Sequence, residues 1–189
     1  MLRYFLLLTL AFPLSGSCQN YADSPFYQRV SSIPSTARAD GYAHGSIQAN
    51  GVIIDLSESV PESSPDFDRI RGWSAAADVD GSKPAEVFHF YTQYDHMNPV
   101  IRYGYDLRAE PVAGTDEIRC TFSAPTDPRG WNWNPNKGIT AVALPADLTP
   151  VVVHSGEVLA IRTLPLGPGR IVAVHYLRLI RTDPMRSTQ

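Results

Sequence analysis

Few cysteines and no long apolar run limit what this 189-residue chain can be. It has 2 cysteines, so at most one disulfide can form, and neither has the spacing of a zinc site. The formal net charge is −3 and no basic patch is present, which argues against nucleic acid as a partner. No apolar stretch approaches the about 20 residues that a membrane-spanning helix needs, so no transmembrane span is expected.

The familiar catalytic signatures are also missing. The sequence contains no G-x-S-x-G nucleophile elbow, no H-E-x-x-H zinc motif, no P-loop and no dinucleotide-binding glycine pattern. Gly167 and Gly169 flank a proline and predict a tight turn rather than a phosphate cradle. The sequence therefore assigns no catalytic residue, no metal ligands and no cofactor.

Residues 1–17 have the composition of a secretory signal peptide. Arg3 precedes an apolar run over residues 4–14, and small residues follow it. A charged start, a short apolar middle and a small-residue end are typical of a cleaved export signal. We therefore expect an exported protein, located in the periplasm, anchored at the outer membrane or released from the cell.

Cys18 stands at the expected cleavage point and leaves two alternatives open. Lipidation there would give the protein a lipid anchor, but Leu14 lies four positions before Cys18 and a lipoprotein signal has its large aliphatic residue at three. Ordinary cleavage next to Ser17 accounts for the same residues. The other cysteine, Cys120, lies in a strand-like run and is expected to be a buried, small apolar side chain.

Composition divides the rest of the chain into a leader, one domain and a tail. Residues 18–40 are polar, contain Pro and Ser and have no period, which predicts a flexible leader. Residues 41–183 predict a single β-rich domain, and residues 184–189 a short tail. A domain of this size is large enough to bury a core.

Alternating apolar and polar side chains predict antiparallel strands. The pattern is clearest over residues 101–110, where Leu107 faces one side while Asp106 and Arg108 face the other. Residues 117–123 continue the pattern and are predicted to be the antiparallel partner. We expect the charged side to face solvent.

Turn signals separate further strands. Asn50 and Gly51 tolerate positive φ angles, so they predict a type I′ turn between two strands. Residues 58–65 predict a loop, and residues 65–71 a short helix. Additional strands are predicted at 139–144, 150–154, 158–164 and 170–181. This pattern favours an all-β fold, either an antiparallel β-sandwich or an open barrel.

One block of the sequence carries a resemblance to known proteins. It includes YGYDL at residues 103–107, IRCTF at 118–122 and HYLR at 175–178. In this order the block resembles small exported proteins of soil bacteria, of the acidobacterial type, which have no assigned activity. The resemblance implies export and a β fold, and it implies no functional residue.

The loop over residues 125–138 is the strongest candidate for binding. It contains Trp131, Asn132, Trp133 and Asn134 in one turn-rich stretch. Indole rings stack on sugar faces and amides bond hydroxyl groups, so this composition is typical of a glycan-binding loop. The alternative, which we favour for at least one indole, is that the rings fold back and cover the core.

Histidines and carboxylates offer weaker alternatives. His89 and His96 flank an aromatic segment, but a turn separates them and makes a shared metal unfavourable. His154 and His175 lie in different predicted strands and could meet across the sheet, with a structural role as the commoner outcome. Asp78 begins a turn-like fragment of a calcium loop that lacks the later acidic ligand.

Together these features predict an exported β-sandwich module that binds a partner or has a structural role in the envelope. The expected partners are a glycan or another envelope protein. The alternative is a secreted hydrolase acting on polysaccharide or peptide, with acidic groups contributed by loops. A cleft that holds a strongly perturbed carboxylate or histidine would favour the hydrolase.

Overall fold

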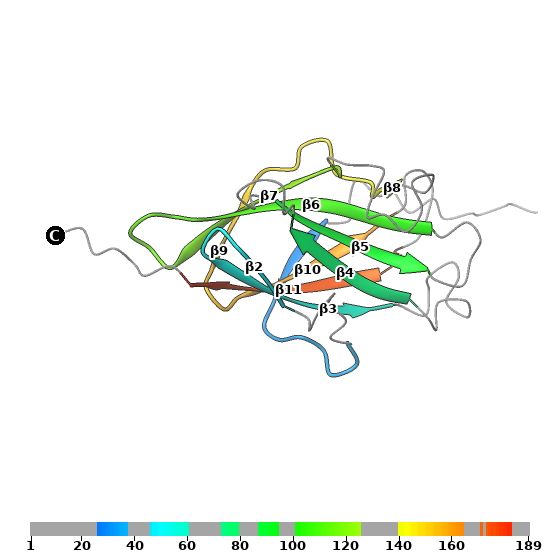
Figure 1. The fold of residues 1–189 in the computed structure, drawn as a ribbon, viewed down its shortest axis with the longest axis horizontal. Helices are drawn as coiled ribbons and strands as arrows, with labels where there is room; N and C mark the ends of the chain where they lie inside the picture. Colours follow the sequence, from blue (N-terminus) through cyan, green and yellow to red (C-terminus); the bar gives the residue numbers. More distant parts are fainter. Residues whose placement is uncertain are drawn as a thin grey trace, which may run out of the picture.

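The computed structural model describes residues 26–37, 46–60, 73–79, 87–94, 101–125, 140–164, 171 and 173–182. In these ranges the regular structure consists of strands, which form two sheets packed face to face (Figure 1). The predicted antiparallel β-sandwich is therefore confirmed. The helix predicted over residues 65–71 lies outside the described residues. No helix among the described residues could span a membrane.

The first sheet has 5 strands in the order β1-β10-β11-β3-β2. All four neighbouring pairs are antiparallel. The strands are β1 (Tyr27–Val30), β2 (Ser46–Ala49), β3 (Val52–Ser59), β10 (Val158–Thr163) and β11 (Ala173–Arg181). The last strand of the chain, β11, therefore lies at the centre of this sheet.

The second sheet has 6 strands, and five of them follow the order β4-β5-β6-β7-β9. The short β8 pairs in parallel with β6, beside the part of β6 that β7 leaves unpaired. The strands are β4 (Trp73–Val79), β5 (Phe88–Tyr94), β6 (Ile101–Pro111), β7 (Glu117–Ser123), β8 (Thr140–Ala141) and β9 (Val151–His154).

Local sequence signals located the hairpins correctly. Asn50 and Gly51 join β2 to β3 with φ angles of 52° and 74°, the left-handed conformation that a type I′ turn requires. In the second sheet, β6 and β7 pair as predicted, with Leu107 opposite Phe122. Both hairpin predictions are confirmed.

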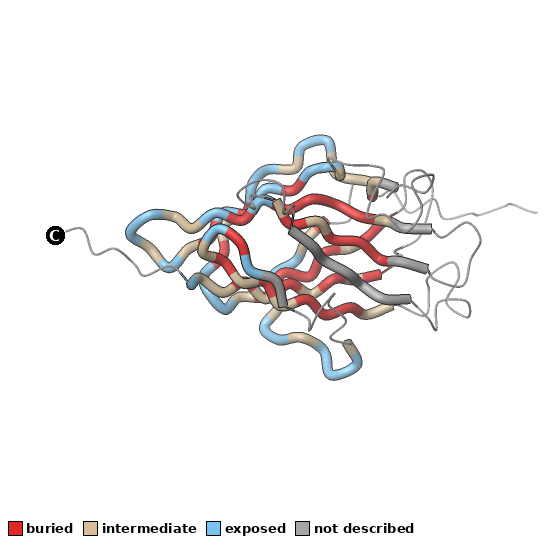
Figure 2. The backbone as a smooth tube through the Cα atoms, in the orientation of Figure 1, coloured by how far each residue is buried: buried red, intermediate tan, exposed pale blue. Residues whose placement is uncertain are grey.

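Buried residues of both sheets form one core. Figure 2 shows the buried stretches of backbone in the strands of both sheets. Leu107 and Cys120 are fully buried, while Arg108 is exposed, as the alternation predicted. Burial raises the pKa of the Cys120 thiol to about 12, so this thiol is inert in the folded protein. Asp106 differs from the prediction: it is on the outer face but only 1% exposed.

The flexible leader predicted over residues 18–40 is wrong for the segment that starts at Phe26. Phe26 is 2% exposed, and its ring packs edge-on against Tyr105 and Phe122. The next four residues form β1, which pairs with β10 along its whole length. A polar composition hid this strand, because one buried aromatic ring and a ladder of backbone hydrogen bonds are enough to dock it. Residues 1–17 and Cys18 lie outside the described residues.

Side-chain and backbone contacts also join the two sheets at their margins. Arg29 in β1 donates to the carbonyl of Val152 in β9. After β8, Val142 donates its N–H to the Gly104 carbonyl at 3.0 Å, and Ala143 donates to Leu164 at 2.7 Å. The segment that follows β8 therefore joins β6 to the end of β10.

Candidate functional site

Each histidine that the structure describes lies beside a carboxylate. The three environments differ: one pair is enclosed on the outer face of the second sheet, one is between the sheets and one is in solvent. The pairs are His89–Asp106, His175–Glu58 and His154–Asp116.

The enclosed outer pair connects β5 to β6. His89 and Asp106 are direct register partners, and their Nδ1 and Oδ1 atoms are 2.6 Å apart. The side chain of His89 is 14% exposed and that of Asp106 is 1% exposed. A carboxylate bonded to Nδ1 orients the imidazole and turns Nε2 away from itself, as in a general base or a metal ligand.

Two more polar residues share this register on the neighbouring strands. Asp78 in β4 is opposite His89, and Ser123 in β7 is opposite Asp106. Asp78 is the penultimate residue of β4. The part of the calcium-loop fragment from residue 80 onward lies outside the described residues.

The connection between β7 and β8 begins beside this pair. Ser123 ends β7 opposite Asp106, and Thr140 starts β8 opposite Tyr103. These two positions on β6 are three residues apart, which corresponds to about 10 Å along a strand. The two ends of the connection formed by residues 124–139 therefore lie beside the same side of β6. Trp131, Asn132, Trp133 and Asn134 belong to this connection and lie outside the described residues.

A second polar cluster lies between the sheets. Glu58 in β3 and His175 in β11 meet Thr92 in β5 and Tyr105 in β6. None of these residues is more than 1% exposed. The Thr92 hydroxyl is 2.8 Å from Glu58 Oε2 and 2.7 Å from His175 Nε2, and the Tyr105 hydroxyl is 3.0 Å from His175 Nδ1.

Hydrogen-bond directions in this cluster follow from its donors. The single hydroxyl proton of Thr92 goes to Glu58, so the Thr92 oxygen accepts from His175 and Nε2 must carry a proton. Burial and the charge of Glu58 raise the pKa of Tyr105 well above its usual value, so its hydroxyl keeps its proton. The cluster thus joins both sheets through hydrogen bonds in the interior.

The third pair lies in solvent at one end of the sandwich. His154 Nδ1 and Asp116 Oδ1 are 2.9 Å apart, with side chains 58% and 56% exposed. The hydrogen bond to Asp116, and then its charge, raise the pKa of His154, and the same hydrogen bond lowers the pKa of Asp116. The predicted meeting of His154 and His175 is wrong, because the side chain of His154 is 58% exposed while His175 is fully buried between the sheets.

The sequence did not predict the interior cluster, because the strand that contains Glu58 was expected to end before this residue. Residues 58–65 were predicted as a loop, but β3 continues to Ser59. Glu58 has the same parity as the buried Ile54 and Leu56, and this period is the local signal that could have placed it inward. No comparable signal connects Glu58 to Thr92 or His175, which are distant in the sequence.

Metal binding has no support among the described side chains. Within those ranges, no group of three or more His, Cys, Asp or Glu residues could hold a metal ion. His96, which the sequence places near His89, is outside the described ranges.

The chain matches no protein family, no curated protein and no solved structure, so its chemistry has to be inferred from its own residues.

Proposed function

We propose that this protein is an exported, non-enzymatic β-sandwich module that binds a glycan or another envelope component through the connection between β7 and β8. The observation that carries the proposal is the anchoring of this connection. Both of its ends lie beside the same side of β6, opposite Tyr103 and Asp106. Connections whose two ends lie close together on a rigid scaffold frequently carry a function.

The length and composition of the connection support the same role. Residues 124–139 exceed the usual connection, whose median length is about 4–6 residues. Trp131 and Trp133 provide aromatic faces for sugar rings, and Asn132 and Asn134 provide amides for hydroxyl groups. The ends of the loop are held by a sandwich whose sheets are joined internally through Thr92, so the loop starts from a rigid base.

A sedimentation assay with insoluble glycans tests this proposal. Peptidoglycan, chitin and cellulose are each incubated with the wild type, with a Trp131→Ala/Trp133→Ala double variant and with Arg108→Ala, an exposed control on the same sheet. We expect the double variant to lose at least about tenfold in affinity, because each aromatic stacking contact contributes about 1 kcal/mol or more. Unchanged binding together with a lower midpoint of thermal unfolding would show that the indoles cover the core instead.

Export is part of the same proposal and has its own measurement. The intact mass of the protein purified from its native host should lack residues 1–17. A mass that retains them would contradict export by signal cleavage. The same spectrum distinguishes an acylated Cys18 from an unmodified N-terminus.

A secreted hydrolase is the second candidate, and the His89–Asp106 pair favours it. An imidazole oriented by an enclosed carboxylate can act as a general base that activates water for attack on a glycosidic or peptide bond. The control is His154→Gln, which changes the exposed pair. Hydrolysis of a polysaccharide or peptide substrate by the wild type that is lost in His89→Gln and kept in His154→Gln would establish this function. If the wild type hydrolyses none of these substrates, the hydrolase is ruled out and the binding module remains the proposed function.

A further inference from the structure

Three side chains with complementary chemistry converge in the interior between the two sheets. The Thr92 hydroxyl oxygen is 2.8 Å from Glu58 Oε2 and 2.7 Å from His175 Nε2. The same imidazole nitrogen is 3.5 Å from Oε2. A nucleophile, an acyl group and a proton donor therefore lie together, as a condensation between a hydroxyl and a carboxyl group requires.

The hydroxyl oxygen is also close to the carbon atom that it would attack. Since Oε2 is bonded directly to Cδ of Glu58, Thr92 Oγ1 is at most one bond length further from Cδ than from Oε2. The two side chains come from strands of different sheets, β3 and β5. The packing of the sheets therefore sets their relative position.

The place where these groups meet is closed to solvent. Glu58 is 1% exposed, and Thr92 and His175 are 0% exposed. Groups held together in this way reach effective molarities of about 10⁵–10⁸ M, and a site that excludes water also prevents hydrolysis of the product. Burial therefore favours the loss of water between the two groups, a reaction that is unfavourable in dilute aqueous solution.

We propose that Thr92 and Glu58 condense to an ester that links the two sheets covalently. Thr92 Oγ1 forms a bond to Cδ of Glu58, and the bond between Cδ and Oε2 breaks. Oε2 takes the hydroxyl proton of Thr92 and a proton from Nε2 of the His175 imidazolium, and leaves as water. The carboxylate and the imidazolium lose their opposite charges together, so the net charge of the three groups is zero before and after the step.

Tyr105 orients the imidazole for this step. Its hydroxyl oxygen is 3.0 Å from Nδ1 of His175 and accepts a hydrogen bond when Nδ1 carries a proton. Burial, and then the charge of Glu58, raise the pKa of Tyr105 well above its usual value, so Tyr105 keeps its own proton. After the step His175 is neutral and retains the proton on Nδ1.

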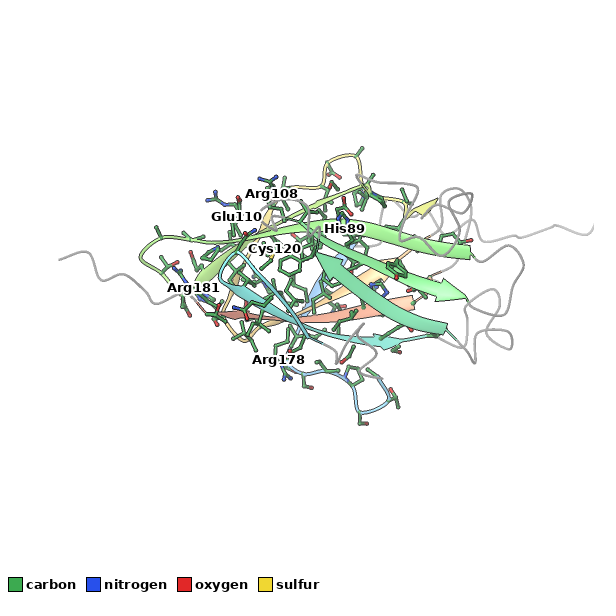
Figure 3. The ribbon with its side chains drawn as sticks, viewed as in Figure 1. His89, Arg108, Glu110, Cys120, Arg178 and Arg181 are labelled. Carbon is green, nitrogen blue, oxygen red and sulfur yellow. The ribbon has the colours of Figure 1, made fainter. Side chains whose placement is uncertain are left out.

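The ester gives this domain the kind of constraint that a disulfide gives many exported proteins. Cys120 is a free, buried thiol, and Figure 3 shows it among the side chains in the interior of the molecule. A bond between residues that are 34 positions apart closes a loop in the unfolded chain and lowers its entropy. This link is independent of any ligand that the connection between β7 and β8 binds.

Peptide mapping of the folded, full-length protein tests the ester. Trypsin places Glu58 in the peptide 39–69 and Thr92 in the peptide 72–102, because Lys83 precedes a proline and is not cleaved. We expect one species whose mass is the sum of these two peptides less one molecule of water. Hydroxylamine at alkaline pH, which cleaves esters but not amides, should return two separate peptides.

Two variants and a control assign the roles of the side chains. Thr92→Val should abolish the linked species, and Thr121→Val, which changes an exposed residue of β7, should keep it. His175→Gln retains a donor toward Thr92 but has no acidic proton to release, so it should also abolish the link. A link that persists in His175→Gln would overturn the role of the imidazole. Two unlinked peptides from the wild type would overturn the ester itself.

Discussion

The interior pair Glu58–His175 and the exposed pair Asp116–His154 contain the same chemical groups in opposite environments. Both side chains of the interior pair are 0% exposed, and Nε2 lies 3.5 Å from Oε2. In the exposed pair both side chains are more than half exposed, although the two atoms are closer, at 2.9 Å. The shorter distance therefore does not indicate which pair contributes more to the stability of the fold.

Desolvation accounts for the difference. Water solvates His154 and Asp116 when they separate, so little free energy is lost. Glu58 and His175 have no such alternative, and inside the protein Thr92 bonds Glu58 Oε2 while Thr92 and Tyr105 bond the two ring nitrogens of His175. The contribution of a buried polar contact is largest when one partner is removed, because the free energy of unfolding then falls by the desolvation penalty of the group left behind.

The largest effect is expected from His175→Ala. This change removes the partner of a buried carboxylate and of two hydroxyl groups, so the free energy of unfolding should fall by about 3–5 kcal/mol. Urea unfolding followed by fluorescence measures it. His175→Gln, which can still donate toward Thr92, should recover part of the loss. If His175→Ala and His154→Ala lowered the free energy of unfolding by equally small amounts, burial would not distinguish the two pairs.

Leu107→Ala tests the apolar part of the same interior. Leu107 is fully buried opposite Phe122, and its truncation should reduce the free energy of unfolding by about 2–5 kcal/mol. The neighbouring Arg108→Ala removes a side chain from the outer face and should cost less than about 1 kcal/mol. Similar losses in the two variants would mean that the two faces of β6 are assigned incorrectly.

Thr92→Val removes one hydroxyl group without a large change in shape. The change deletes the hydrogen bond to Glu58 and the acceptor for His175, so we expect a loss of about 1–3 kcal/mol. Chemical denaturation gives the value. Thr121→Val is the control, because Thr121 is an exposed residue of β7 in the second sheet. A neutral effect of Thr92→Val would show that the interior hydrogen bonds contribute little.

The smallest effect is expected at His154 and depends on pH. Because the folded-state pKa of His154 is raised above its ordinary value of 6.5, its contribution is fully present below that value and is lost as the pH rises through the folded pKa. The lowered pKa of Asp116 makes its own contribution present above 3.8 and lost as the pH falls through its folded value.

An NMR titration of the imidazole measures this prediction. The midpoint for His154 should lie above 6.5 in the wild type and move back toward 6.5 in Asp116→Asn. Added salt should weaken the shift, since the pair is exposed. An identical midpoint in both proteins would contradict the assigned role of Asp116.

The local alternation of apolar and polar residues was sufficient to predict the strands that have one buried and one exposed face. The period of two in β6 and β7 and the Asn50–Gly51 turn each depend on neighbouring residues, so they can be recognised in the chain before it folds. The same reasoning failed for β1, which is short and polar, and for the end of β3, where an inward Glu58 resembles a loop residue.

Contacts between residues that are distant in the sequence are determined by how the two sheets pack. Amino-acid order carries the period that makes a strand, the turn that reverses it and the composition of the Trp131–Trp133 connection, because each is a short-range property. It does not show that Asp106 is enclosed beside His89, nor that His175 meets a threonine 83 positions away. These contacts arise when the two sheets are stacked. Burial then makes a polar residue either bonded or costly, and only the packed structure shows which residues are buried.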